Sequence, residues 1–135
     1  AGTVRDVLPA LLTSLGDEAH RVSWVCDPMH GNTFTSPSGH KTRRFEDVVD
    51  EVRGFFASHA EAGTHPGGIH VELTGNDVTE CVGGVSAVTE ASLSDRYHTY
   101  CDPRLNASQA LELAFLVAEE VHAQKPPRRQ LAAGE

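Results

Sequence analysis

The chain of 135 residues is long enough for one domain, and its composition (39% hydrophobic, 22% charged) is typical of globular rather than disordered proteins. Its formal net charge of -8 argues against a nucleic-acid or anionic-membrane surface, because those partners require basic patches. With no membrane-length apolar run, no visible signal peptide and three widely spaced cysteines, the sequence favours a cytoplasmic protein with reduced thiols.

The first part of the chain predicts a helix followed by a strand. Apolar residues recur at helical spacing over residues 3–15, with Pro9 inside the segment and Gly16 as its stop. An apolar run over residues 22–27 then ends at Pro28, because proline cannot donate to a sheet ladder. The run does not alternate with polar residues, which predicts a strand covered on both faces.

The middle of the chain repeats this order. Residues 30–42 are polar and predict a loop, and a second helical stripe over residues 43–62 ends at Gly63. We expect a tight turn at residues 65–68 and a second strand over residues 69–73. A helix between two strands predicts a βαβ unit whose strands are parallel.

The last part predicts one further helix. A helical turn near residues 90–96 interrupts an irregular stretch, and Asn106 with Gln109 forms a capping box for a helix over residues 107–122. The Pro- and charge-rich residues 124–135 predict a flexible tail. The buried face of the helix is expected at Ala110, Leu113, Ala114, Val117 and Val121.

Two parallel strands and three helices make a poor domain, because a two-stranded parallel sheet exposes both of its edges. The regular alternation of strands and helices instead predicts an α/β fold that is one stretch of a larger (β/α) barrel, incomplete in this chain.

Three candidate metal ligands fall near the expected carboxyl ends of the strands. They are His30 after the first strand, Glu72 on the second strand, and Asp102 in the loop before the last helix. One imidazole and two carboxylates suit Mn²⁺, Fe²⁺, Co²⁺ or Zn²⁺. The alternatives are a surface histidine, a carboxylate paired within the protein, and a turn residue before proline.

Two other groups of residues have a structural and a functional interpretation. The basic cluster Lys41-Thr42-Arg43-Arg44 is either a solvated face or an anion clamp at a helix start. The cysteines Cys26, Cys81 and Cys101 are expected to be small core residues.

Longer runs resemble the carboxy-terminal part of class II 3-deoxy-D-arabino-heptulosonate 7-phosphate (DAHP) synthases. The runs are CDPMHGNTF, GHKTRRF, GTHPGGIHVELTGNDVTECVGG and CDPRLNASQALELAFLVAE, which together extend to about residue 120. The resemblance implies a (β/α)8 barrel with the two predicted strands as its seventh and eighth, residues 1–123 being the barrel portion. It also implies condensation of phosphoenolpyruvate with erythrose 4-phosphate, in the first step of the shikimate pathway.

The resemblance also implies roles for individual residues. His30, Glu72 and Asp102 match family positions that hold a divalent ion, with Mn²⁺ or Co²⁺ expected first and Fe²⁺, Zn²⁺ or Cd²⁺ as alternatives. His30 would in addition lie beside phosphoenolpyruvate as a catalytic residue. Lys41 and Arg43 match the family's KTR run and are expected to contact substrate.

The family's cysteine ligand and most of its phosphoenolpyruvate-binding residues lie upstream in the barrel and are absent from this chain. We therefore expect a fragment that is inactive and poorly folded alone and needs the amino-terminal part of the barrel, with a homo-oligomer as the full-length form. The competing hypotheses are a non-catalytic remnant that binds a partner, and an unrelated metal hydrolase built on the same three residues.

Overall fold

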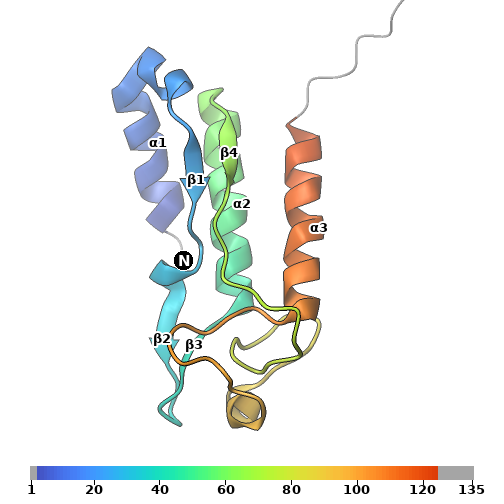
Figure 1. Ribbon diagram of the computed structural model, residues 1–135. Helices are drawn as coiled ribbons and strands as arrows, with labels where there is room; N and C mark the ends of the chain where they lie inside the picture. The colour runs from blue at the N-terminus through green and yellow to red at the C-terminus, as the bar shows by residue number, and fades with distance from the viewer. Residues whose placement is uncertain (1–2, 125–135) are drawn as a thin grey trace, which may run out of the picture.

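The computed structural model describes residues 3–124, which form a mixed α/β structure (Figure 1). The helices are α1 (Thr3–Leu15), α2 (Phe45–Ala62) and α3 (Ala107–Ala123), and the strands are β1 (Trp24–Cys26), β2 (Thr33–Thr35), β3 (Lys41–Arg43) and β4 (Pro66–Ile69). Short 3₁₀ helices are η1 (Gly16–Arg21), η2 (His30–Asn32) and η3 (Glu90–Asp95). Except for Gln124, the predicted flexible tail lies outside the described residues.

Strands β1 and β4 pair in parallel, as predicted. Between them in the chain lie η2, the β2–β3 hairpin and α2. In Figure 1 the pair runs along α2, with α1 and α3 on opposite sides. Both strands run toward the end of the molecule where the β2–β3 hairpin lies. The segments that follow β1 and β4 therefore both begin at the hairpin end of the molecule.

The core lies between the helices and the strand pair. The predicted stripe of α2 is confirmed at Val48, Val52, Phe55 and Phe56, all of which are buried. In α1 only Leu8 and Leu12 of the predicted apolar positions are buried, while Val7, Leu11 and Leu15 are exposed. In α3 the predicted face is confirmed at Leu113 but is wrong at Ala114 and Val121, which are exposed.

The second strand lies earlier in the chain than predicted. The predicted turn at residues 65–68 is wrong, since β4 begins at Pro66 and pairs from there with β1. After Ile69 the ladder ends with a bond from the His70 N–H to the Cys26 carbonyl oxygen (2.7 Å). Leu73 then forms a bridge with Leu105, so this segment is paired to the loop before α3 rather than to β1.

The expected loop over residues 30–42 contains an antiparallel hairpin of β2 and β3. Thr33-Phe34-Thr35 consists of β-branched and aromatic residues that favour a strand. It pairs with Lys41-Thr42-Arg43 across a turn that includes Gly39 at φ +84°. The prediction of a strand covered on both faces is also wrong within residues 3–124, because Val25 of β1 is 60% exposed.

The capping prediction for α3 is confirmed. The Asn106 side chain accepts a hydrogen bond from the Gln109 N–H (2.9 Å), and the Gln109 side chain accepts one from the Asn106 N–H (3.1 Å). Within residues 3–124, none of the helices has the length and apolar composition needed to cross a bilayer.

Close approach of β4 to β1 requires glycine at position 67. A Cβ atom there would lie 2.7 Å from the backbone oxygen of Trp24. We expect Gly67→Ala to reduce the free energy of unfolding by about 1–3 kcal/mol, because the strands must separate to admit the methyl group. Thermal melting followed by circular dichroism, on the chain joined to the amino-terminal part of a homologous barrel, measures the effect. Gly75→Ala is the matched control, since a Cβ at position 75 meets no atom within 4 Å; equal melting temperatures for the two variants would contradict the prediction.

Candidate metal centre

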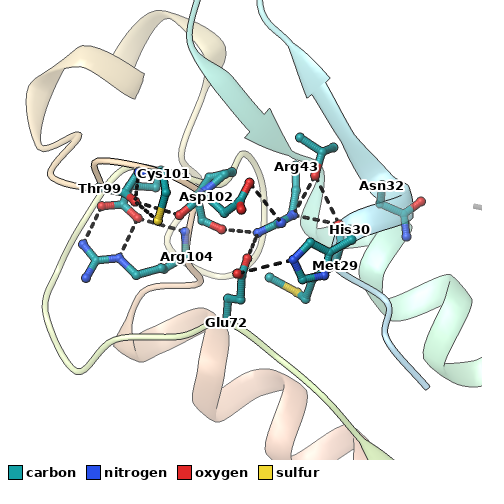
Figure 2. A network of polar contacts seen from close by, with 12 residues as sticks. Met29, His30, Asn32, Arg43, Glu72, Thr99, Cys101, Asp102 and Arg104 are labelled. Carbon is teal, nitrogen blue, oxygen red and sulfur yellow. Dashed lines mark hydrogen bonds and ion pairs between the residues drawn. The ribbon is translucent and has the colours of Figure 1, made fainter. Parts of the chain in front are cut away.

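The three predicted ligands come together at the carboxyl ends of the parallel strands. His30, Glu72 and Asp102 each offer one ligand atom, and these atoms all lie within 4.8 Å of one another. His30 Nε2 lies 3.5 Å from Glu72 Oε1. Figure 2 shows the three side chains converging from the segment after β1, the segment after β4 and the loop before α3.

Asp27 fixes the orientation of His30. Its Oδ1 accepts backbone N–H bonds from Met29 (3.0 Å) and His30 (3.2 Å), while its Oδ2 lies 2.7 Å from His30 Nδ1. Burial raises the pKa of the Asp27 carboxyl, but the bonds from Met29 and His30 outweigh it and leave the pKa below its usual value. Since an ionised carboxylate can only accept, Nδ1 donates to Asp27, and Nε2 is the ring nitrogen that faces Glu72. Sequence reasoning missed this role of Asp27.

Arg43 holds the carboxylate oxygen of Glu72 that does not face His30. Arg43 Nη1 donates to Glu72 Oε2 over 2.6 Å, which leaves Oε1 directed toward His30. The backbone of Glu72 is fixed as well, because its carbonyl oxygen accepts from the Leu105 N–H (3.0 Å). Glu72 therefore reaches the site as an oriented, partly buried carboxylate.

Asp102 is paired with protein cations. Lys41 Nζ bonds its Oδ1, and Arg43 Nη2 lies 4.0 Å from the same oxygen. The hydrogen bond from Lys41 lowers the pKa of Asp102, with further lowering by the charges of Lys41 and Arg43. The carboxylate is therefore in its metal-binding, ionised form at neutral pH.

The basic cluster divides into exposed and buried members. The side chains of Lys41 and Arg44 are about half exposed (49% and 48%), and Arg44 pairs with Glu90 and stacks over the ring of Phe34. Arg43 has no exposed side-chain surface, which no local sequence pattern indicated. The predicted substrate contacts of Lys41 and Arg43 stay predictions.

The cysteine predictions are confirmed for two of three residues. Cys26 and Cys81 are buried free thiols, and burial raises the pKa of each to about 12. Cys101 is exposed, so its assignment to the core was wrong. It lies next to Asp102 in the wall of a cavity of about 510 Å³ that Glu72 also lines. Among the described residues, none of these thiols belongs to the His30, Glu72 and Asp102 group.

The donor set fits a divalent cation. Ligand–metal distances of about 2.0–2.2 Å place any two ligand atoms up to roughly 4.4 Å apart, so the observed separations require only a small adjustment. An imidazole whose second nitrogen donates to a carboxylate is the usual arrangement of a metal-binding histidine. One nitrogen and two carboxylate oxygens suit Mn²⁺, Fe²⁺, Co²⁺ or Zn²⁺.

Glu80 holds the loop that carries Asp102. It is fully buried and accepts bonds from Arg104 Nη2 (2.7 Å), Arg104 Nε (3.0 Å) and the N–H groups of Arg104 (2.8 Å) and His98 (3.2 Å). Burial raises the pKa of Glu80, but the bonds from Arg104 and His98 outweigh it, so the pKa is lowered.

The amino-acid sequence is similar to those of known enzymes over most of its length. The sequence profile described as "Class-II DAHP synthetase family" matches residues 1–118. The chain is 61% identical over 119 residues to a phospho-2-dehydro-3-deoxyheptonate aldolase of Streptomyces coelicolor, covering 88% of the chain and 26% of that relative. It is 59% identical over 116 residues to the Mycolicibacterium smegmatis enzyme of that name, covering 86% of the chain and 25% of the relative.

A third relative with the same enzyme name, from Streptomyces lividans, is 60% identical over 119 residues, which cover 88% of the chain and 81% of that relative. The chain thus spans about a quarter of the length of the S. coelicolor and M. smegmatis relatives.

The Glu80 network predicts a pH-dependent stability. At pH 7 we expect Glu80→Gln to lower the free energy of unfolding by about 2 kcal/mol, because charged hydrogen bonds to Arg104 are lost. A carboxyl whose pKa is lowered on folding stabilises the fold above its unfolded pKa, and this contribution disappears as the pH falls through the folded pKa. The difference between wild type and variant should therefore shrink as the pH falls below 4.5, the ordinary pKa of Glu.

Urea unfolding at pH 7 and at pH 3, on the chain joined to the amino-terminal part of a homologous barrel, measures this difference. Glu119→Gln, the same change at an exposed position of α3, is the control and should leave stability nearly unchanged at both values. A Glu80→Gln deficit of equal size at the two pH values would contradict the prediction.

Proposed function

The chain belongs to the class-II DAHP synthetase family, and from that premise we propose that it supplies three of the metal ligands of a DAHP synthase. The reaction joins C3 of phosphoenolpyruvate to the aldehyde carbon of erythrose 4-phosphate, takes up water and releases phosphate. The observation that carries the proposal is the convergence of His30, Glu72 and Asp102 within 4.8 Å. Mn²⁺ or Co²⁺ is the expected ion, with Fe²⁺, Zn²⁺ and Cd²⁺ as alternatives.

We further propose that β1 and β4 are the seventh and eighth strands of a (β/α)8 barrel. Such a barrel takes about 250 residues, more than this chain offers. Support comes from the parallel pairing of the two strands and from the exposed Val25 of β1, which further barrel elements would cover. The carboxyl ends of barrel strands are also where catalytic groups lie in this architecture.

The residues of the chain divide the chemical work. His30, Glu72 and Asp102 would hold a divalent ion, which would act as a Lewis acid toward the aldehyde carbonyl. Asp27 holds the His30 ring so that Nε2 faces the site, and Arg43 directs Glu72 Oε1 toward the same point. Lys41, half exposed beside Asp102, places a positive charge at the edge where a phosphorylated substrate would enter.

A chimera tests this function. In it, the full 135-residue chain replaces the matched 26% of the S. coelicolor relative. We expect the chimera, but not the chain alone, to form DAHP and phosphate from the two substrates. Chelation should abolish the activity and added Mn²⁺ should restore it, since the ion is required for the chemistry.

Glu72→Gln in the chimera should reduce kcat by at least about 100-fold and weaken Mn²⁺ binding, measured by calorimetry, because one charged ligand is lost. Glu119→Gln removes the same charge from the surface of α3 and should leave both quantities unchanged. A folded chimera that neither binds Mn²⁺ nor turns over would favour the alternative of a non-catalytic remnant.

A further inference from the structure

Arg43 contacts all three segments that carry the candidate ligands. Its Nε donates to the carbonyl oxygen of Met29 (2.7 Å), the residue before His30, and to Thr33 Oγ1 (3.0 Å). Its Nη1 donates to Glu72 Oε2 (2.6 Å) and to the carbonyl oxygen of Pro103, the residue after Asp102. Figure 2 shows the guanidinium between these segments.

The remaining nitrogen of Arg43 faces Asp102. Nη2 is buried and has no hydrogen-bond partner among the described residues, and it lies 4.0 Å from Asp102 Oδ1. A small rotation of the carboxylate would bring the two groups into hydrogen-bond distance. One buried cation thus lies between both carboxylates of the site.

This environment differs from that of a substrate-binding arginine. The side chain of Arg43 has no exposed surface, and Nε and Nη1 already donate to protein oxygens. The neighbouring Lys41 and Arg44 side chains are about half exposed and can reach solvent. A phosphate could contact Nε or Nη1 only after these protein contacts had been broken, and Nη2 is buried beside Asp102.

We propose that Arg43 is a positioning residue, which sets the spacing of His30, Glu72 and Asp102 for a divalent cation rather than binding substrate. This inference rests on the proposed function. Its physical basis is the planar, forked guanidinium, whose donors point in fixed directions and can join three segments at once. Its positive charge also offsets the repulsion between the two carboxylates that must approach one ion. Lysine, a single point charge, cannot reproduce these directions.

The first test compares Arg43→Lys with Arg44→Lys in the chimera. Both changes keep the positive charge, but only Arg43→Lys removes a buried guanidinium group. We expect Arg43→Lys to raise the Mn²⁺ dissociation constant about 10- to 100-fold in calorimetry, the range typical of groups that orient metal ligands. Its visible absorption spectrum with Co²⁺ should also change, because the ligand geometry changes. Arg44→Lys should stay within about twofold of wild type and keep the spectrum.

A second pair keeps the test decisive where Arg43→Lys does not fold, as judged by its melting curve. Thr33→Val removes an acceptor of Arg43 Nε, whereas Thr35→Val makes the same change at an exposed position of the same strand. We expect Thr33→Val to weaken Mn²⁺ binding several-fold and Thr35→Val to have no effect.

The outcomes separate the two proposals. If wild-type chimera binds no divalent ion, the proposed function fails and the inference fails with it. If wild type binds Mn²⁺ and Thr33→Val and folded Arg43→Lys bind it equally well, only the inference is overturned. A raised KM for a phosphorylated substrate with unchanged metal affinity in Arg43→Lys would assign the residue to substrate binding instead.

Discussion

Two neighbouring parallel strands end at the same edge of their sheet, and the arrangement of the site depends on this constraint. The β1–β4 pairing is parallel, with a backbone approach at Gly67 that leaves no room for a side chain. It brings the segment of His30 beside that of Glu72, although more than forty residues separate them. The bridge between Leu73 and Leu105 then adds the loop of Asp102 to the same end.

The charges of the site form a connected set. Asp27, Glu72 and Asp102 supply three carboxylates around one imidazole, and Lys41 and Arg43 lie against them as cations. These ion pairs hold the carboxylates close together through contacts within the protein, so the fold itself orients the three side chains. The loop that carries Asp102 is held in the same way by the buried Glu80 and its partner Arg104.

The sequence predicts the parts of this arrangement that depend on local patterns. Pro28 marks the end of β1, the Asn106–Gln109 pair marks the start of α3, and the apolar stripe of α2 identifies its buried face. The order of strands and loops suggested His30, Glu72 and Asp102 as candidates, and the resemblance to DAHP synthases supported all three. Glu72 was expected on the second strand but lies after β4, which ends at Ile69. The burial of Arg43 could not be predicted, because a run of basic residues normally faces solvent and its acceptors come from three distant segments. The start of β4 was misplaced because Pro66 and two glycines are typical of a turn, while β1 supplied the ladder that made them a strand.

The most direct test of a metal centre at this end of the strands is anomalous diffraction from crystals of the chimera soaked in Mn²⁺. We expect a peak at the manganese edge that is bounded by His30 Nε2 and by carboxylate oxygens of Glu72 and Asp102. No peak there at saturating Mn²⁺, or a peak held by other residues, would contradict the account.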